Sequence, residues 1–166
     1  AEAETDAQRA RISTAVADMC RDSGQPLEAI QAVGEVLDAE DASDRPLLGL
    51  ARLCEGLNFW EQAHRALTAA GQDYDAARLQ EDYLEAPDEA MQGYSSILEA
   101  QPEHLAAALA MTRLHRRSGD RAALAQAHAR VAGLVEHPAL RVVHHILAGH
   151  LFESLDDLEK SAEAYK

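Results

Sequence analysis

Apolar residues recur along the chain at three- and four-residue intervals, in segments separated by Pro and Gly. This period is typical of amphipathic helices, whereas half-buried strands alternate apolar and polar residues. Prolines that open a segment and glycines that follow one are common helix start and stop signals. The pattern predicts helices at residues 8–23, 26–39, 45–57, 60–70, 72–85, 87–100, 104–118, 121–135, 138–154 and 157–166. We therefore expect an all-α fold built from helical hairpins.

The sequence matches itself when it is shifted by 34 residues. Ala17 then falls on Ala51 and Cys20 on Cys54, and further matches follow in the second helices. The two cysteines would thus be small apolar side chains buried at equivalent positions of successive repeats. Stacked equivalents lie on the order of 10 Å apart, which is too far for a disulfide. We expect free thiols.

The same template recurs later in the chain: a small residue, a bulky residue three positions on, a turn, and a small residue in the second helix. It is carried by Thr112, His115, Gly119, Asp120, Leu124, His128 and Val131, and again by Gly149, Phe152, Asp156, Asp157, Ser161 and Tyr165. This pattern resembles the tetratricopeptide-repeat (TPR) family over nearly the whole chain. The stretches 88–104 and 147–166 are the best individual matches.

The resemblance implies a TPR-like α-solenoid, a right-handed superhelix of antiparallel helix pairs, with about five degenerate repeats and a truncated last repeat. The expected hairpins are 8–41, 44–70, 71–102, 104–136 and 138–166, in a single array that we interpret as a fragment of a longer protein. The small residues of the second helices, Ala29, Ala63, Ala90, Leu124 and Ser161, are separated by 34, 27, 34 and 37 residues. Since Arg78 and Glu81 also fill packing positions, we expect altered stacking near residues 70–86.

First helices line the concave surface of TPR arrays, and that surface is where such arrays usually bind. The resemblance places the residue after each first-helix small residue on it, which gives Asp18, Arg52, Leu79, Arg113 and His150. One turn later lie Asp22, Glu55, Arg116, Arg117 and Glu153. We take Arg52, Arg113, Arg116, Arg117, His150 and Asp18 as candidate peptide-binding residues. Arginine binds carboxylates through two parallel hydrogen bonds, which favours an acidic peptide. The alternative is an ordinary solvated face.

The net charge of −14 is unevenly distributed. Residues 1–100 hold 7 basic and 21 acidic residues, whereas residues 101–166 hold 8 of each. Such an acidic chain is not expected to bind nucleic acid, whose phosphates need a basic surface. Residues 104–150 are rich in Arg and His, so a binding site there would respond to pH.

No catalytic motif is present, and no two histidines are spaced i, i+4 as a helical zinc site requires. We expect no enzyme, cofactor or metal site. Phe59 and Trp60 are expected to pack against the preceding turn, although an exposed Trp60 would mark an interface.

These features predict a scaffold or adaptor that holds a protein or peptide partner. The alternatives are a regulatory or targeting domain of a larger enzyme or secretion-apparatus protein, and a self-associating module. The longest apolar run, residues 105–111, is too short to span a membrane. Free cysteines favour the cytoplasm, but the opening AEAETDAQ is also compatible with a signal-peptidase cut and a periplasmic location. Abundant Ala and Arg with little Lys is typical of a GC-rich bacterial genome.

Overall fold

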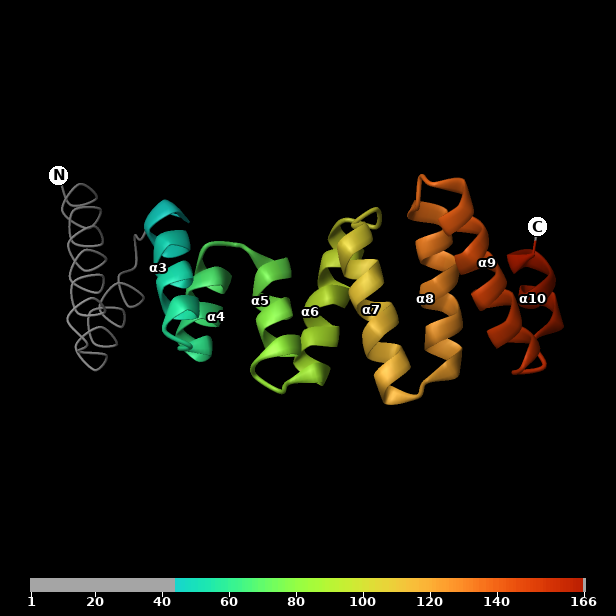
Figure 1. Ribbon diagram of the computed structural model, residues 1–166, viewed down its shortest axis with the longest axis horizontal. Coiled ribbons are helices and arrows are strands. Elements are labelled where there is room, and N and C mark those ends of the chain that lie inside the picture. Colours follow the sequence, from blue (N-terminus) through green and yellow to red (C-terminus); the bar gives the residue numbers. More distant parts are fainter. Residues whose placement is uncertain (1–43, 166) are drawn as a thin grey trace. The chain divides into compact units, whose positions relative to one another are not determined.

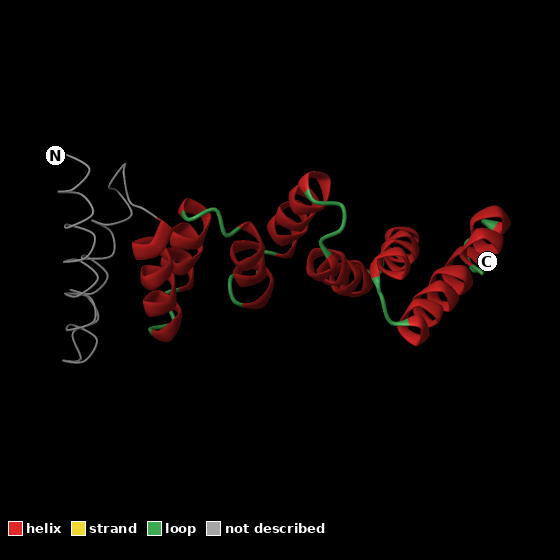
Figure 2. Ribbon diagram, turned by 90° about the horizontal axis from the view of Figure 1, so that it is seen from above, coloured by secondary structure: helices red, strands yellow, loops and turns green. Residues whose placement is uncertain are grey.

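The computed structural model describes residues 44–165, and over that range it consists of helices joined by short turns, without strands (Figures 1 and 2). The helices are α3 (Asp44–Gly56), α4 (Trp60–Ala69), α5 (Asp73–Asp82), α6 (Pro87–Ala100), α7 (Leu105–Ser118), α8 (Arg121–Leu134), α9 (Pro138–Glu153) and α10 (Leu158–Ala164). Each end lies within three residues of the predicted one. The expected hairpin 8–41, with Asp18 and Cys20, lies outside the described residues. The division of the whole chain into five hairpins stays a prediction.

Turn residues fix the helix boundaries through local chemistry. Gly119 follows α7 with a φ of 76°, a left-handed conformation that glycine adopts without steric cost. Asp120 then caps α8, because its carboxylate accepts a hydrogen bond from the Ala123 amide at 3.0 Å. Asp157 caps α10 in the same way, at 3.2 Å from the Lys160 amide. The turn residues predicted from the repeat therefore end and begin helices as expected.

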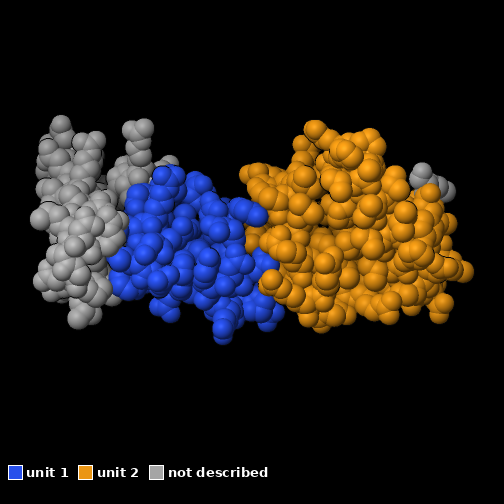
Figure 3. Space-filling model, in the orientation of Figure 1, with its two compact units in different colours: residues 1–90 blue, residues 91–166 orange. Residues whose placement is uncertain are grey.

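The described residues belong to two compact units, residues 1–90 and 91–166, with the boundary inside α6 (Figure 3). In the first unit, α4 packs against α3 and α5. Cys54 is fully buried among these helices as a free thiol, which confirms the prediction for this cysteine. Trp60 and Phe59 pack against the same core, so Trp60 is a packing residue as predicted. The core residues are Leu50, Ala51, Leu53, Cys54, Ala63, Ala66, Leu67, Ala76 and Leu79.

Helix α5 departs from the repeat in two ways. Leu79 is only 1% exposed and packs in the core of the first unit, so the prediction that it faces a concave surface is wrong. The reason is that α5 buries it against the apolar residues of α3 and α4. Glu81 is buried, and Arg78 pairs with Glu55 at 3.8 Å and with Asp75 at 3.4 Å. Polar residues at packing positions are thus accommodated without loss of the helix. The altered stacking expected near residues 70–86 stays a prediction.

In the second unit, α8 packs against α7 and α9, and α10 packs against α9. Small residues at the predicted anchor positions are buried: Thr112 is 4% and Ser161 6% exposed. Gly149 lies so close to Tyr165 that a Cβ atom built on it would meet the ring at 2.5 Å. An alanine at this position would therefore require the Tyr165 ring to move.

Candidate functional site

Helix α7 presents three of the predicted arginines to solvent. Arg113, Arg116 and Arg117 are all exposed, and their three- and four-residue spacing places them on one face of the helix. Leu109 shares that face, one turn before Arg113, and 36% of it is exposed. No Asp or Glu occurs in α7. We call these four residues the arginine face.

The other predicted binding residues lie elsewhere. Arg52 is exposed on α3, in the first unit. His150 is exposed on α9, where its Nδ1 lies 3.6 Å from a carboxylate oxygen of Glu153. The edge of its ring also meets Tyr165, with the ring centroids 5.9 Å apart. His150 is therefore held by its own helix and by the residue after α10.

His128 of α8 and His144 of α9 lie in contact, within reach of the positive charge of Arg116. The Nδ1 atoms of His128 and His144 are 3.0 Å apart, and His128 is only 3% exposed. Burial, the neighbouring His144 and the Arg116 guanidinium lower the pKa of His128 to about 4. Burial and Arg116 lower the pKa of His144 as well. His128 thus fills the bulky packing position that the repeat predicts, as a neutral side chain at physiological pH.

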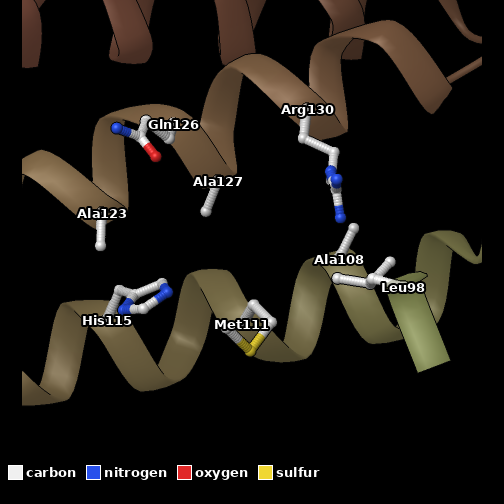
Figure 4. A pocket seen from close by; sticks show the side chains of 8 residues that line it. All are labelled: Leu98, Ala108, Met111, His115, Ala123, Gln126, Ala127 and Arg130. Carbon is white, nitrogen blue, oxygen red and sulfur yellow. The ribbon is translucent and has the colours of Figure 1, made fainter. Parts of the chain in front are cut away.

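A hollow of about 300 Å³ opens between α7 and α8, which we call the α7–α8 hollow (Figure 4). Apolar and polar residues both line it, and the polar ones, His115, Gln126 and Arg130, include no carboxylate. The lining residues are Leu98, Ala108, Met111, His115, Ala123, Gln126, Ala127 and Arg130. The volume is at the lower end of the range for ligand sites, about 300–1,000 Å³. A single side chain or a small group could occupy it.

Arg130 gives this hollow its charge. It reaches from α8 toward Ala108 of α7 and Leu98 of α6 (Figure 4). Within residues 44–165 its guanidinium forms neither a hydrogen bond nor an ion pair. The lining thus combines an arginine with apolar residues and contains no Asp or Glu. It favours an occupant that carries both a carboxylate and an apolar group.

A second hollow of about 350 Å³ lies among α8, α9 and α10, which we call the α8–α10 hollow. Its lining residues are Gln126, Ala129, His145, Phe152, Lys160, Glu163 and Ala164. The Lys160 ammonium is 2.7 Å from the Asp157 carboxylate and lies 5.7 Å from the centre of the Phe152 ring. The positive charge of Lys160 is thus already paired with Asp157, the N-cap of α10. Glu163 adds a negative charge to the lining.

No family model and no curated protein matches the sequence. Solved structures do match the fold. A crystal structure of MamA protein is 13% identical, covers 95% of this chain and 88% of its own, and has a TM-score of 0.57. MamA 41-end from Desulfovibrio magneticus RS-1 is 15% identical over 95% of this chain and 91% of its own, with a TM-score of 0.53.

The chain has the fold of tetratricopeptide-repeat proteins. This TPR-type fold confirms the all-α helical solenoid predicted from the 34-residue repeat. At these identities the likeness concerns the fold alone, so the binding surfaces must be judged from this chain's own residues.

Two searches of the described residues concern other kinds of site. Among residues 44–165, no group of three or more His, Cys, Asp or Glu side chains is arranged to hold a metal ion. No helix in the same range has the length and apolar character needed to cross a membrane.

The residues that line both hollows were not predicted from the sequence. The repeat pattern singles out the position after each small anchor residue, which on α7 gives the arginine face. Ala108, Met111 and His115 lie on another side of α7, since Ala108 and Arg113 are about 140° apart on a helix of 3.6 residues per turn. The 37-residue offset between Leu124 and Ser161 would have predicted that residues of one hollow have equivalents in the other.

Proposed function

We propose that this chain is a protein-interaction module that binds an acidic segment of a partner protein on the arginine face of α7. The TPR-type fold supports this role, because stacked hairpins offer extended surfaces on which such arrays hold other proteins. The same role would serve a free-standing scaffold and a regulatory or targeting domain of a larger enzyme or secretion-apparatus protein.

One observation carries the proposal. An exposed leucine, Leu109, lies among Arg113, Arg116 and Arg117 on a helix that contains no acidic residue. The guanidinium groups provide planar donors for carboxylates, and Leu109 provides apolar area for a side chain between those carboxylates. Arg52, His150 and Asp18 are secondary candidates that rest on the repeat pattern alone and not on any position relative to α7.

A peptide titration tests the proposal. The probe is a fluorescein-labelled peptide that contains Glu-Glu-Leu-Glu-Glu, and fluorescence polarisation reports its affinity for the whole chain. Arg113→Glu combined with Arg117→Glu should weaken binding by more than about tenfold, since each reversal replaces attraction by repulsion. Arg113→Lys retains the charge without the planar fork and should lose less. Binding should also weaken as salt is added.

Arg65→Glu combined with Arg121→Glu is the matched control, because it makes the same charge change at two exposed arginines on helices other than α7. An Arg113→Glu/Arg117→Glu double variant that binds the peptide as tightly as the natural chain overturns the proposal. Arg52→Glu and His150→Gln then measure how far the secondary residues contribute.

Self-association is a second candidate function, favoured by residues 140–147 of α9. This part of the helix exposes five large apolar side chains, each 39–55% accessible: Leu140, Val142, Val143, Ile146 and Leu147. A contiguous apolar surface of this kind is typical of interaction sites. Light scattering over a concentration series should show a dimer that Val143→Glu dissociates. A strictly monomeric chain at every concentration would exclude this function for residues 1–166.

A further inference from the structure

The two hollows of the second unit occupy equivalent positions of successive repeats. Shifting the α7–α8 hollow by 37 residues converts five of its lining residues into lining residues of the α8–α10 hollow. The pairs are Ala108 and His145, His115 and Phe152, Ala123 and Lys160, Gln126 and Glu163, and Ala127 and Ala164. The offset is the one that relates the repeat anchors Leu124 and Ser161. The same geometry thus recurs twice, as stacked repeats require.

The hollows are also contiguous, because Gln126 of α8 lines both of them. Its amide carries two donors and one acceptor oxygen, so it can bond to the backbone of a chain that passes from one hollow to the other. Gln126 is exposed, and within the described residues it has no hydrogen-bond partner. A peptide segment that crosses α8 from one hollow to the other would therefore pass the Gln126 amide, which is available for hydrogen bonding.

The two linings differ in their charged residues. The α7–α8 hollow contains the unpaired Arg130 and no carboxylate, so it attracts a negative charge. The α8–α10 hollow contains Glu163 and a lysine already paired with Asp157, so it favours an uncharged side chain over Phe152, Ala129 and Ala164. The charges therefore select an occupant that is acidic at one end only.

We propose that the two hollows together bind one extended segment of a partner protein, with an apolar side chain in each hollow and a carboxylate beside Arg130. The helices α7 and α9 both pack on α8, and packed helices lie about 8–10 Å apart. An extended chain advances about 3.3 Å per residue, so the two apolar anchors are about three to six residues apart.

This surface is separate from the arginine face. The inference shares with the proposed function only the premise that the chain binds a protein segment. Arg130→Gln and Ala127→Leu act on the α7–α8 hollow, whereas Arg113→Glu acts on the arginine face. The two sets of variants therefore distinguish failure of one proposal from failure of the other.

The probes are labelled synthetic peptides of Gly and Ser that carry two leucines, with one Asp beside the first. The spacing between the leucines runs from about two to about eight residues. Binding to the whole chain should peak within the range of about three to six residues. Replacing either leucine by Gly, or the Asp by Lys, should then weaken binding by about tenfold or more.

Filling each hollow separately tests whether both are used. Ala127→Leu fills the α7–α8 hollow and Ala129→Leu the α8–α10 hollow, and Ala122→Leu is the matched control because Ala122 is exposed on the same helix outside both. Ala and Leu are both strong helix formers, so circular dichroism should be unchanged. Arg130→Gln, at an exposed and unpaired side chain, keeps the test available if a filled variant fails to fold.

Loss of binding with Ala127→Leu, Ala129→Leu and Arg130→Gln, but not with Ala122→Leu or Arg113→Glu, supports the inference. Affinity that is independent of leucine spacing overturns it. Loss confined to Arg113→Glu overturns it too and leaves the proposed function standing. The absence of any binding up to about 1 mM peptide also overturns it.

Discussion

Acidification should destabilise the second unit through His128. Its imidazole is buried between α8 and α9, 3.0 Å from His144 and close to the positive charge of Arg116. The folded state therefore holds the pKa of His128 at about 4, against 6.5 in the unfolded chain. Between these two values the unfolded chain binds a proton that the folded chain does not, so stability falls as pH falls.

The magnitude follows from the size of that shift. A difference of about 2.5 units corresponds to about 3 kcal/mol. No loss is expected above about pH 7, and the loss is complete only below about pH 4, once both states are protonated. For a helical unit of this size 1 kcal/mol displaces the thermal midpoint by about 4–8 °C, so His128 alone should lower it by about 12–24 °C.

The test compares thermal unfolding of the natural chain with that of His128→Gln at several pH values between 7.5 and 4, followed by circular dichroism. Glutamine retains a hydrogen-bonding side chain at this position but does not titrate. The midpoint of the natural chain should fall faster with acidification than that of the variant, and His137→Gln, which removes an exposed histidine, should behave like the natural chain. Parallel pH profiles for the natural chain and His128→Gln would refute the reasoning.

Three further predictions concern packing. Gly149→Ala should lower the unfolding free energy by about 1 kcal/mol, because the added Cβ atom meets the Tyr165 ring; adding Tyr165→Ala should abolish that cost in a double-mutant cycle measured by urea unfolding. Cys54 should resist alkylation at pH 7.5 in peptide-resolved mass spectrometry and react once the chain is unfolded, because burial, and then Glu55, raise the pKa of its thiol to about 11. Tyr83→Ala should red-shift the fluorescence of Trp60, the single tryptophan, and destabilise the first unit by about 1 kcal/mol, because it removes a ring stacked at 3.8 Å.

Local sequence determined the helix ends, and so it was the part of the fold that could be predicted most closely. Gly119 ends α7 in a left-handed conformation and Asp120 caps α8, as the sequence predicts for these residue types. Helix α5 shows where local reasoning fails. It ends at Asp82, three residues before the predicted end, and Glu85 has a φ of 51°, outside the range of a right-handed helix.

Side-chain environments depend on neighbours that the repeat pattern does not contain. Leu79 occupies a position expected on the concave surface, yet α3 and α4 bury it. Arg113, Arg116 and Arg117 are exposed, as the repeat pattern predicts for this face of a first helix, and their role in binding stays a prediction. Trp60 at the start of α4 stacks on Tyr83, the residue that follows α5. The repeat spacing is irregular in this region, so the spacing did not predict this contact.

The hollows follow from the composition of this chain. TPR-like hairpins pack bulky residues against small ones, but here aromatics are only 4% of the sequence and alanine fills many positions. Ala108 of α7 and Ala123 and Ala127 of α8 each contribute only a methyl group to the lining, so these positions leave the space between the two helices open. In the next repeat the equivalent positions carry His145, Lys160 and Ala164, so a hollow of similar size has a different rim. An alanine-rich solenoid can thus retain its helix packing and still leave a series of shallow sites, whose chemistry is set one repeat at a time by the few larger side chains around them.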